Sequence, residues 1–134
     1  MTERSRFLAR LIGLFLLCLA APMAANRQEI LDAILGTIRS PELLFLYGMI
    51  ALALGLSLVL THNVWRGGAA TVVVTVVGWL LLVRSVILLF LPTTSLEELF
   101  AAIRFADFFY EYLVVVVALG LFLTWSGFRR AELD

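Results

Sequence analysis

The run Ala53-Leu54-Gly55-Leu56 decides the fold, because it returns unchanged 65 residues later as Ala118-Leu119-Gly120-Leu121. Further identities recur at the same spacing without a gap: Gly13 with Gly78, Leu16-Leu17 with Leu81-Leu82, Ile38-Arg39 with Ile103-Arg104, and Tyr47 with Tyr112. A fixed period of this kind indicates a repeated structural unit. The sequence therefore predicts two tandem units, residues 1–67 and 68–134, each made of a helix, a short amphipathic connector and a second helix.

The composition is that of a membrane protein. Hydrophobic residues make up 63% of the chain and charged residues 15%, and the mean hydropathy is +1.05. A soluble domain of this size has no core large enough to bury so much apolar surface. The formal charge is zero and every basic residue is arginine, which gives no support to nucleic-acid binding. The single cysteine, Cys18, has no partner for an intrachain disulfide.

Four apolar segments approach the roughly 20 residues that a helix needs to cross about 30 Å of hydrocarbon. They cover residues 7–25, 42–61, 69–91 and 106–128. Some stretches are rich in β-branched residues, but backbone groups in lipid must be paired within their own segment, which favours helices. The predicted fold is therefore an all-α integral membrane bundle of four transmembrane helices.

The first segment also has the pattern of a cleaved signal peptide, with a basic start, an apolar centre and small residues at 21–25. The repeat favours its retention, because its counterpart at 76–90 belongs to a span that stays in the mature chain.

The connectors, residues 26–40 and 92–105, are predicted to be amphipathic helices that lie along the membrane surface and shield the end of the bundle. Ser95 with Glu98, and Asn26 with Glu29, have the spacing of a capping box. The side shared by both termini and the central loop holds six arginines: Arg4, Arg6, Arg10, Arg66, Arg129 and Arg130. The positive-inside rule therefore predicts that both termini and the central loop are cytoplasmic. We expect a multi-pass protein of a bacterial inner membrane.

Arg84 is the charge that a membrane tolerates least, since it lies well inside the third segment. Glu111 enters from the same end of the fourth segment, and Asp107 stands one helical turn earlier. We expect an intramembrane ion pair between Arg84 and Glu111, with Asp107 nearer the surface. Such a pair either fixes the register of two helices or serves as an ion or proton site.

Two further sets of residues are predicted to have structural roles. His62 and Trp65 are expected at the membrane interface, His62 as a helix cap rather than a pH switch. The small residues Gly48, Ala51, Gly55 and Gly120 are expected at helix contacts. The sequence offers no catalytic set, no metal site and no cofactor motif.

Gly78-Trp79-Leu80-Leu81-Leu82, Ser85 and the terminal Leu91-Pro92, followed by an amphipathic turn and another span, resemble the repeat of HdeD-type membrane proteins. The resemblance covers the second half best, and Arg84 is not part of it. That family has more than four spans as a rule and often a glycine where this chain has Ser85. The resemblance implies a stress-related inner-membrane protein without a defined catalytic site.

The leading functional prediction is a non-enzymatic scaffold or accessory subunit that works in the lipid bilayer as a homo-oligomer or within a larger membrane complex. The alternative is a small ion or proton channel or transporter that uses Arg84 and Glu111. A membrane enzyme is the third possibility.

Overall fold

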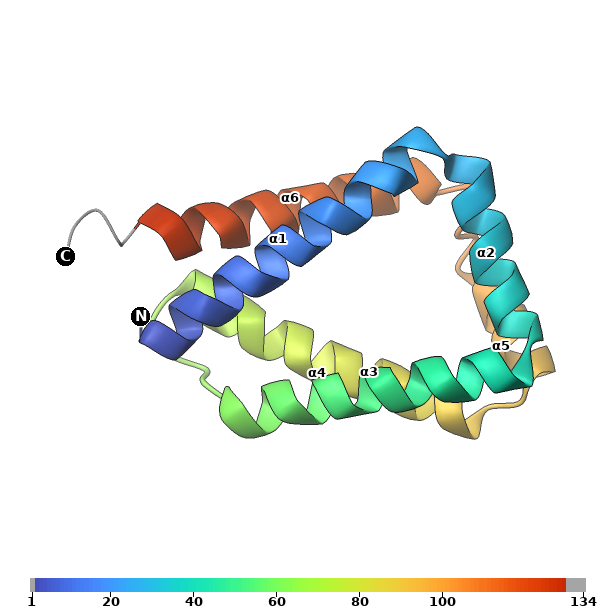
Figure 1. Ribbon diagram of the computed structural model, residues 1–134, viewed down its shortest axis with the longest axis horizontal. Helices are drawn as coiled ribbons and strands as arrows, with labels where there is room; N and C mark the ends of the chain where they lie inside the picture. Colours follow the sequence, from blue (N-terminus) through green and yellow to red (C-terminus); the bar gives the residue numbers. More distant parts are fainter. Residues whose placement is uncertain (1, 130–134) are drawn as a thin grey trace.

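The computed structural model describes residues 2–129, in which the chain forms six α-helices (Figure 1). They are α1 (Glu3–Ala25), α2 (Arg27–Arg39), α3 (Pro41–Thr61), α4 (Ala69–Phe90), α5 (Thr93–Ala102) and α6 (Phe109–Arg129). By length and composition α1, α3, α4 and α6 can each cross a membrane. The all-helical class and the four long apolar helices are therefore confirmed. Arg130, one of the arginines counted above, lies outside the described residues.

The long helices form two antiparallel pairs rather than one compact bundle. Helix α1 packs against α6, and α3 packs against α4. The pairs meet near the start of α1 and diverge toward the opposite end, where α2 and α5 lie side by side as the third side of a triangle (Figure 1). The start of α1, the end of α6 and the α3–α4 loop all lie at the end where the pairs meet. Because α2 has 13 residues, it is about 20 Å long, enough to hold the pairs apart.

Each corner of the triangle is held by a buried apolar cluster. Where the two pairs meet, α1, α4 and α6 bury Ala9, Ile12, Ala70, Val74 and Leu123. A second cluster joins α2 to α1 and α6 through Ala20, Met23, Leu31, Phe109 and Leu113. A third joins α2, α3 and α5 through Ile38, Leu44 and Leu96. The connectors thus pack against the ends of both helix pairs.

The caps at the helix starts differ from the prediction. Helix α5 begins at Thr93 after Pro92, so Ser95 lies inside its first turn and no side chain caps the helix. Asn26 precedes α2, but its side chain makes no capping hydrogen bond. Proline at the N-cap of α5 starts the helix earlier than the predicted capping box, because its fixed φ suits a helix start. Helix α3 is capped instead by Ser40, whose side chain accepts a hydrogen bond from Leu43 N.

In each helix pair, α3–α4 and α1–α6, a glycine lets the two helices come into close contact. A Cβ atom at Gly55 in α3 would lie 2.8 Å from the backbone nitrogen of Leu82 in α4. A Cβ atom at Gly120 in α6 would lie 3.0 Å from the side chain of Leu17 in α1. Small residues permit this approach, and in lipid it is the main source of helix–helix attraction.

Gly55→Ala is expected to destabilise the α3–α4 pair by about 1–3 kcal/mol, since the added methyl group meets backbone that cannot move aside. Gly36→Ala is the matched control, because Gly36 lies in α2 with nothing within 4 Å of its Cβ position. It should stabilise the protein by about 0.5–1 kcal/mol through helix propensity. Unfolding in mixed micelles with increasing SDS measures both changes. Equal changes in stability for Gly55→Ala and Gly36→Ala would contradict the close contact at Gly55.

Candidate functional site

The α3–α4 loop, residues 62–68, holds a network of side-chain hydrogen bonds that ties it to α4. His62 ends α3; it is only 3% exposed, and its Nε2 lies 3.2 Å from the backbone oxygen of Thr71 in α4. The hydroxyl of Thr75 donates to Val64 O at 2.7 Å and accepts from Val64 N at 3.1 Å. The loop is therefore tied to the first two turns of α4, and His62 is enclosed by this packing.

Two indole rings share one acceptor in the same loop. Asn63 Oδ1 accepts hydrogen bonds from Trp65 Nε1 at 2.8 Å and from Trp79 Nε1 at 3.3 Å. Both rings remain partly exposed. The turn ends at Gly67 and Gly68, whose φ angles of +103° and +121° favour glycine. His62 and Trp65 were predicted from the sequence, whereas Asn63 and Thr75 were not, because neither residue type carries a distinctive motif.

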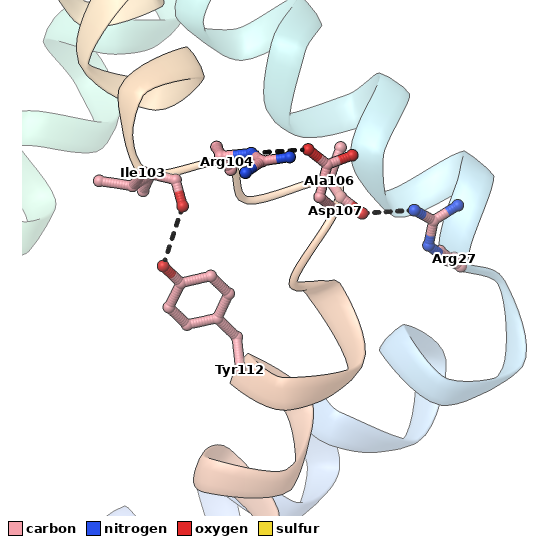
Figure 2. Close-up of polar contacts among 6 residues, drawn as sticks. All are labelled: Arg27, Ile103, Arg104, Ala106, Asp107 and Tyr112. Carbon is pink, nitrogen blue, oxygen red and sulfur yellow. Dashed lines mark hydrogen bonds and ion pairs between the residues drawn. The ribbon is translucent and has the colours of Figure 1, made fainter.

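A second polar group fixes the corner between α5 and α6 (Figure 2). Arg104 Nε lies 3.1 Å from Asp107 Oδ2, and the Tyr112 hydroxyl donates to Ile103 O at 3.2 Å. The guanidinium of Arg27, at the start of α2, donates to Ala106 O. Asp107 was predicted to accompany Glu111 beside Arg84. It serves instead as the local partner of Arg104 in an exposed turn.

Arg84 and Glu111 do not form the predicted ion pair. The neighbour of α4 along its length is α3 rather than α6. The guanidinium of Arg84 accordingly lies over the Tyr47 ring in α3, 5.3 Å from its centroid. Glu111 is exposed at the start of α6. Among residues 2–129 the ion pairs are Arg39–Glu97 and Arg104–Asp107, and no carboxylate pairs with Arg84.

Arg84 lies on the face of α4 that is turned toward the other sides of the triangle. Val77 and Leu88 stand seven residues before and four residues after it, which places all three on one helix face. Val77 packs against the cluster where the pairs meet, and Leu88 packs against the α2–α3–α5 cluster. Arg84 lies between these contacts and is exposed. It therefore faces the region that the three sides enclose.

The predicted packing residues lie at the pair interfaces. Gly48 and Gly55 face Leu89 and Leu82 of α4, and Gly120 faces Leu17 of α1. Ala51 is buried in α3, one turn from each of its two glycines.

Comparison of the chain with protein-family models, with curated proteins and with solved structures finds no match. The resemblance to HdeD-type proteins therefore stays a prediction. Among the described residues no group of three or more His, Cys, Asp or Glu side chains is placed to hold a metal ion.

Thr75→Val is expected to cost about 1–3 kcal/mol of stability, because it removes the hydroxyl that satisfies both backbone groups of Val64. Thr71→Val is the matched control on the same helix. Thr71 is also buried, but its Oγ1 has no hydrogen-bond partner among the described residues, so its loss should cost nothing. Thermal unfolding of both variants in detergent tests the network. Equal destabilisation would contradict it.

Proposed function

We propose that this protein is a multi-pass protein of the bacterial inner membrane that acts as a non-enzymatic scaffold or accessory subunit. Both termini and the α3–α4 loop are assigned to the cytoplasm. The distribution of charge supports this orientation. Within the described residues, the end of the molecule with the termini carries five arginines and one acid, namely Arg4, Arg6, Arg10, Arg66 and Arg129 against Glu3. The end with α2 and α5 is rich in acids.

The proposal includes two tandem units, and one pair of contacts supports it. Gly120 faces Leu17 at the α1–α6 interface, and Gly55 faces Leu82 at the α3–α4 interface. Gly120 is the repeat equivalent of Gly55, and Leu82 is the repeat equivalent of Leu17, because each pair of positions differs by 65 residues. Equivalent residues of the two units thus make equivalent contacts, with each unit's first helix packed against the other unit's last.

Assembly with a second membrane-embedded chain is the function that Arg84 supports best. Helix α4 ends at Phe90, so Arg84 is about 9 Å from that end along the axis. An arginine inside a spanning helix costs about 3 kcal/mol unless its charge is satisfied. Within residues 2–129 its only recorded contact is the ring of Tyr47. A neighbouring chain that presents a carboxylate to the enclosed region would satisfy this charge.

A second copy of the chain is one source of that carboxylate. Glu111 is exposed in the first turn of α6, and the start of α6 lies at the same end of the molecule as the end of α4, which carries Arg84. The alternative of a channel relied on an Arg84–Glu111 pair within one chain, and no described contact favours it.

The Arg84→Leu variant tests the assembly. Extraction into polymer-bounded nanodiscs, followed by native mass spectrometry, should give a species larger than the 14.9 kDa chain. Removal of Arg84 leaves the partner's carboxylate unpaired, which weakens assembly by about 3–5 kcal/mol. Val83→Ala, at the adjacent exposed residue, is the matched control and should leave the mass unchanged.

A monomeric wild-type protein, or an Arg84→Leu variant that assembles normally, would sink the proposal. The double variant Arg84→Glu with Glu111→Arg identifies the partner. Recovery of the assembled mass indicates a second copy, whereas continued dissociation indicates a different chain.

A further inference from the structure

A hollow of about 200 Å³ lies between the start of α4 and the end of α6. These two ends are neighbours at the meeting point of the helix pairs (Figure 1). The walls are formed by the first residues of α4 with the preceding glycines and by the last turns of α6: Gly67, Gly68, Ala69, Ala70, Thr71, Phe122, Trp125, Ser126 and Arg129.

The wall from α4 presents unused backbone donors. The first hydrogen bond of the helix runs from Val72 N to Gly68 O, so the amides of Ala69, Ala70 and Thr71 have no acceptor within it. No side chain caps this end. At the start of α1, by contrast, the side chain of Thr2 accepts a hydrogen bond from Ser5 N. The free amides and the positive end of the helix dipole favour an anion.

Thr71 independently indicates a ligand. The residue lines the hollow, is 3% exposed, and its Oγ1 has no hydrogen-bond partner among the described residues. A buried hydroxyl without a partner is uncommon, because the loss of its hydrogen bonds to water is uncompensated. An acceptor held at the first turn of α4 would supply the missing partner.

The wall from α6 adds positive charge and a second hydroxyl. Arg129 lies in the last turn, with its guanidinium 4.5 Å from the centroid of the Trp125 ring. Ser126 lies beside them on the same wall. An arginine, hydroxyl groups and helix-start amides are the donors that bind phosphate oxygens in proteins. Phe122 and Trp125 add an apolar wall that suits the hydrocarbon next to such a headgroup.

We propose that this hollow binds a phosphate ester through Arg129, Thr71 and the first amides of α4. Its depth favours a phospholipid headgroup as the source. Helix α4 has 22 residues and is therefore about 33 Å long, close to the thickness of the hydrocarbon core. Its first turn then lies at the boundary where lipid phosphates lie. The site is separate from Arg84, so it stands or falls independently of the assembly proposed above.

The test measures ligand-induced stabilisation of the full chain in detergent. The probes are short-chain phosphatidylglycerol, the diacylglycerol with the same chains, and inorganic phosphate. Thermal unfolding is followed as each probe is titrated. Phosphatidylglycerol should raise the unfolding temperature, whereas the diacylglycerol should not.

Arg129→Gln and Thr71→Val should each weaken the phosphatidylglycerol effect roughly tenfold, as expected for the loss of a charged or a buried hydrogen bond. Thr71→Val should unfold like the wild type without ligand, so that a loss of binding is not a loss of folding. Arg66→Gln is the matched control, because Arg66 lies at the same end of the molecule but does not line the hollow. The affinity of the Arg66→Gln variant for phosphatidylglycerol should stay within about threefold of the wild type, since an exposed charge outside the site acts only through screened attraction.

Each outcome decides a part of the proposal. Stabilisation by inorganic phosphate that depends equally on Arg129 and Thr71 would support the phosphate site but overturn the lipid as its source. Equal affinity in Arg129→Gln, Thr71→Val and the wild type would overturn the site. So would equal stabilisation by diacylglycerol and phosphatidylglycerol.

Discussion

The closeness of two helix crossings determines how the rest of the molecule is arranged. At Gly55 and at Gly120 the neighbouring helix approaches to within 3.0 Å of where a Cβ atom would be. In lipid no hydrophobic driving force brings helices together, so contacts of this kind and interhelical hydrogen bonds provide the attraction. They join α3 to α4 and α1 to α6, but they provide nothing between one pair and the other. The pairs are therefore free to diverge. The angle between them is set by the apolar clusters at the corners and by α2 and α5.

This arrangement explains why the connectors are amphipathic. A short loop would have drawn the ends of α1 and α3 together into a compact bundle. Instead α2 buries Leu31 against one helix pair and Ile38 against the other, about 10 Å apart along its axis. Glu29, Asp32 and Arg39 of α2 are left exposed, and Arg39 pairs with Glu97 of α5. The same two helices thus link the two pairs and keep them separate.

The sequence predicted the elements of this fold much better than their partners. The helical spans follow from length and hydropathy, which are local properties, and the small residues correctly indicated where helices approach one another. Which helices pack against each other is not a local property of the sequence. Antiparallel neighbours in sequence suggested α4 beside α6, and Arg84 beside Glu111. The structure instead places α6 against α1, more than 100 residues away in the chain, and this leaves Arg84 over Tyr47. The polar network of Asn63 and Thr75 escaped prediction for a different reason, since neither residue type carries a distinctive motif.

Under the proposed duplication, the two units differ most where the pairs meet. Positions 10 and 75 are equivalent by the repeat period, and each ties down the end of the facing helix. Arg10 donates from Nε to Gly127 O at 2.9 Å, and its guanidinium lies over the ring of Phe128. Thr75, with a much shorter side chain, binds both backbone groups of Val64 instead. The hydroxyl of Thr75 therefore ties the α3–α4 loop to α4, whereas the guanidinium of Arg10 ties the end of α6 to α1.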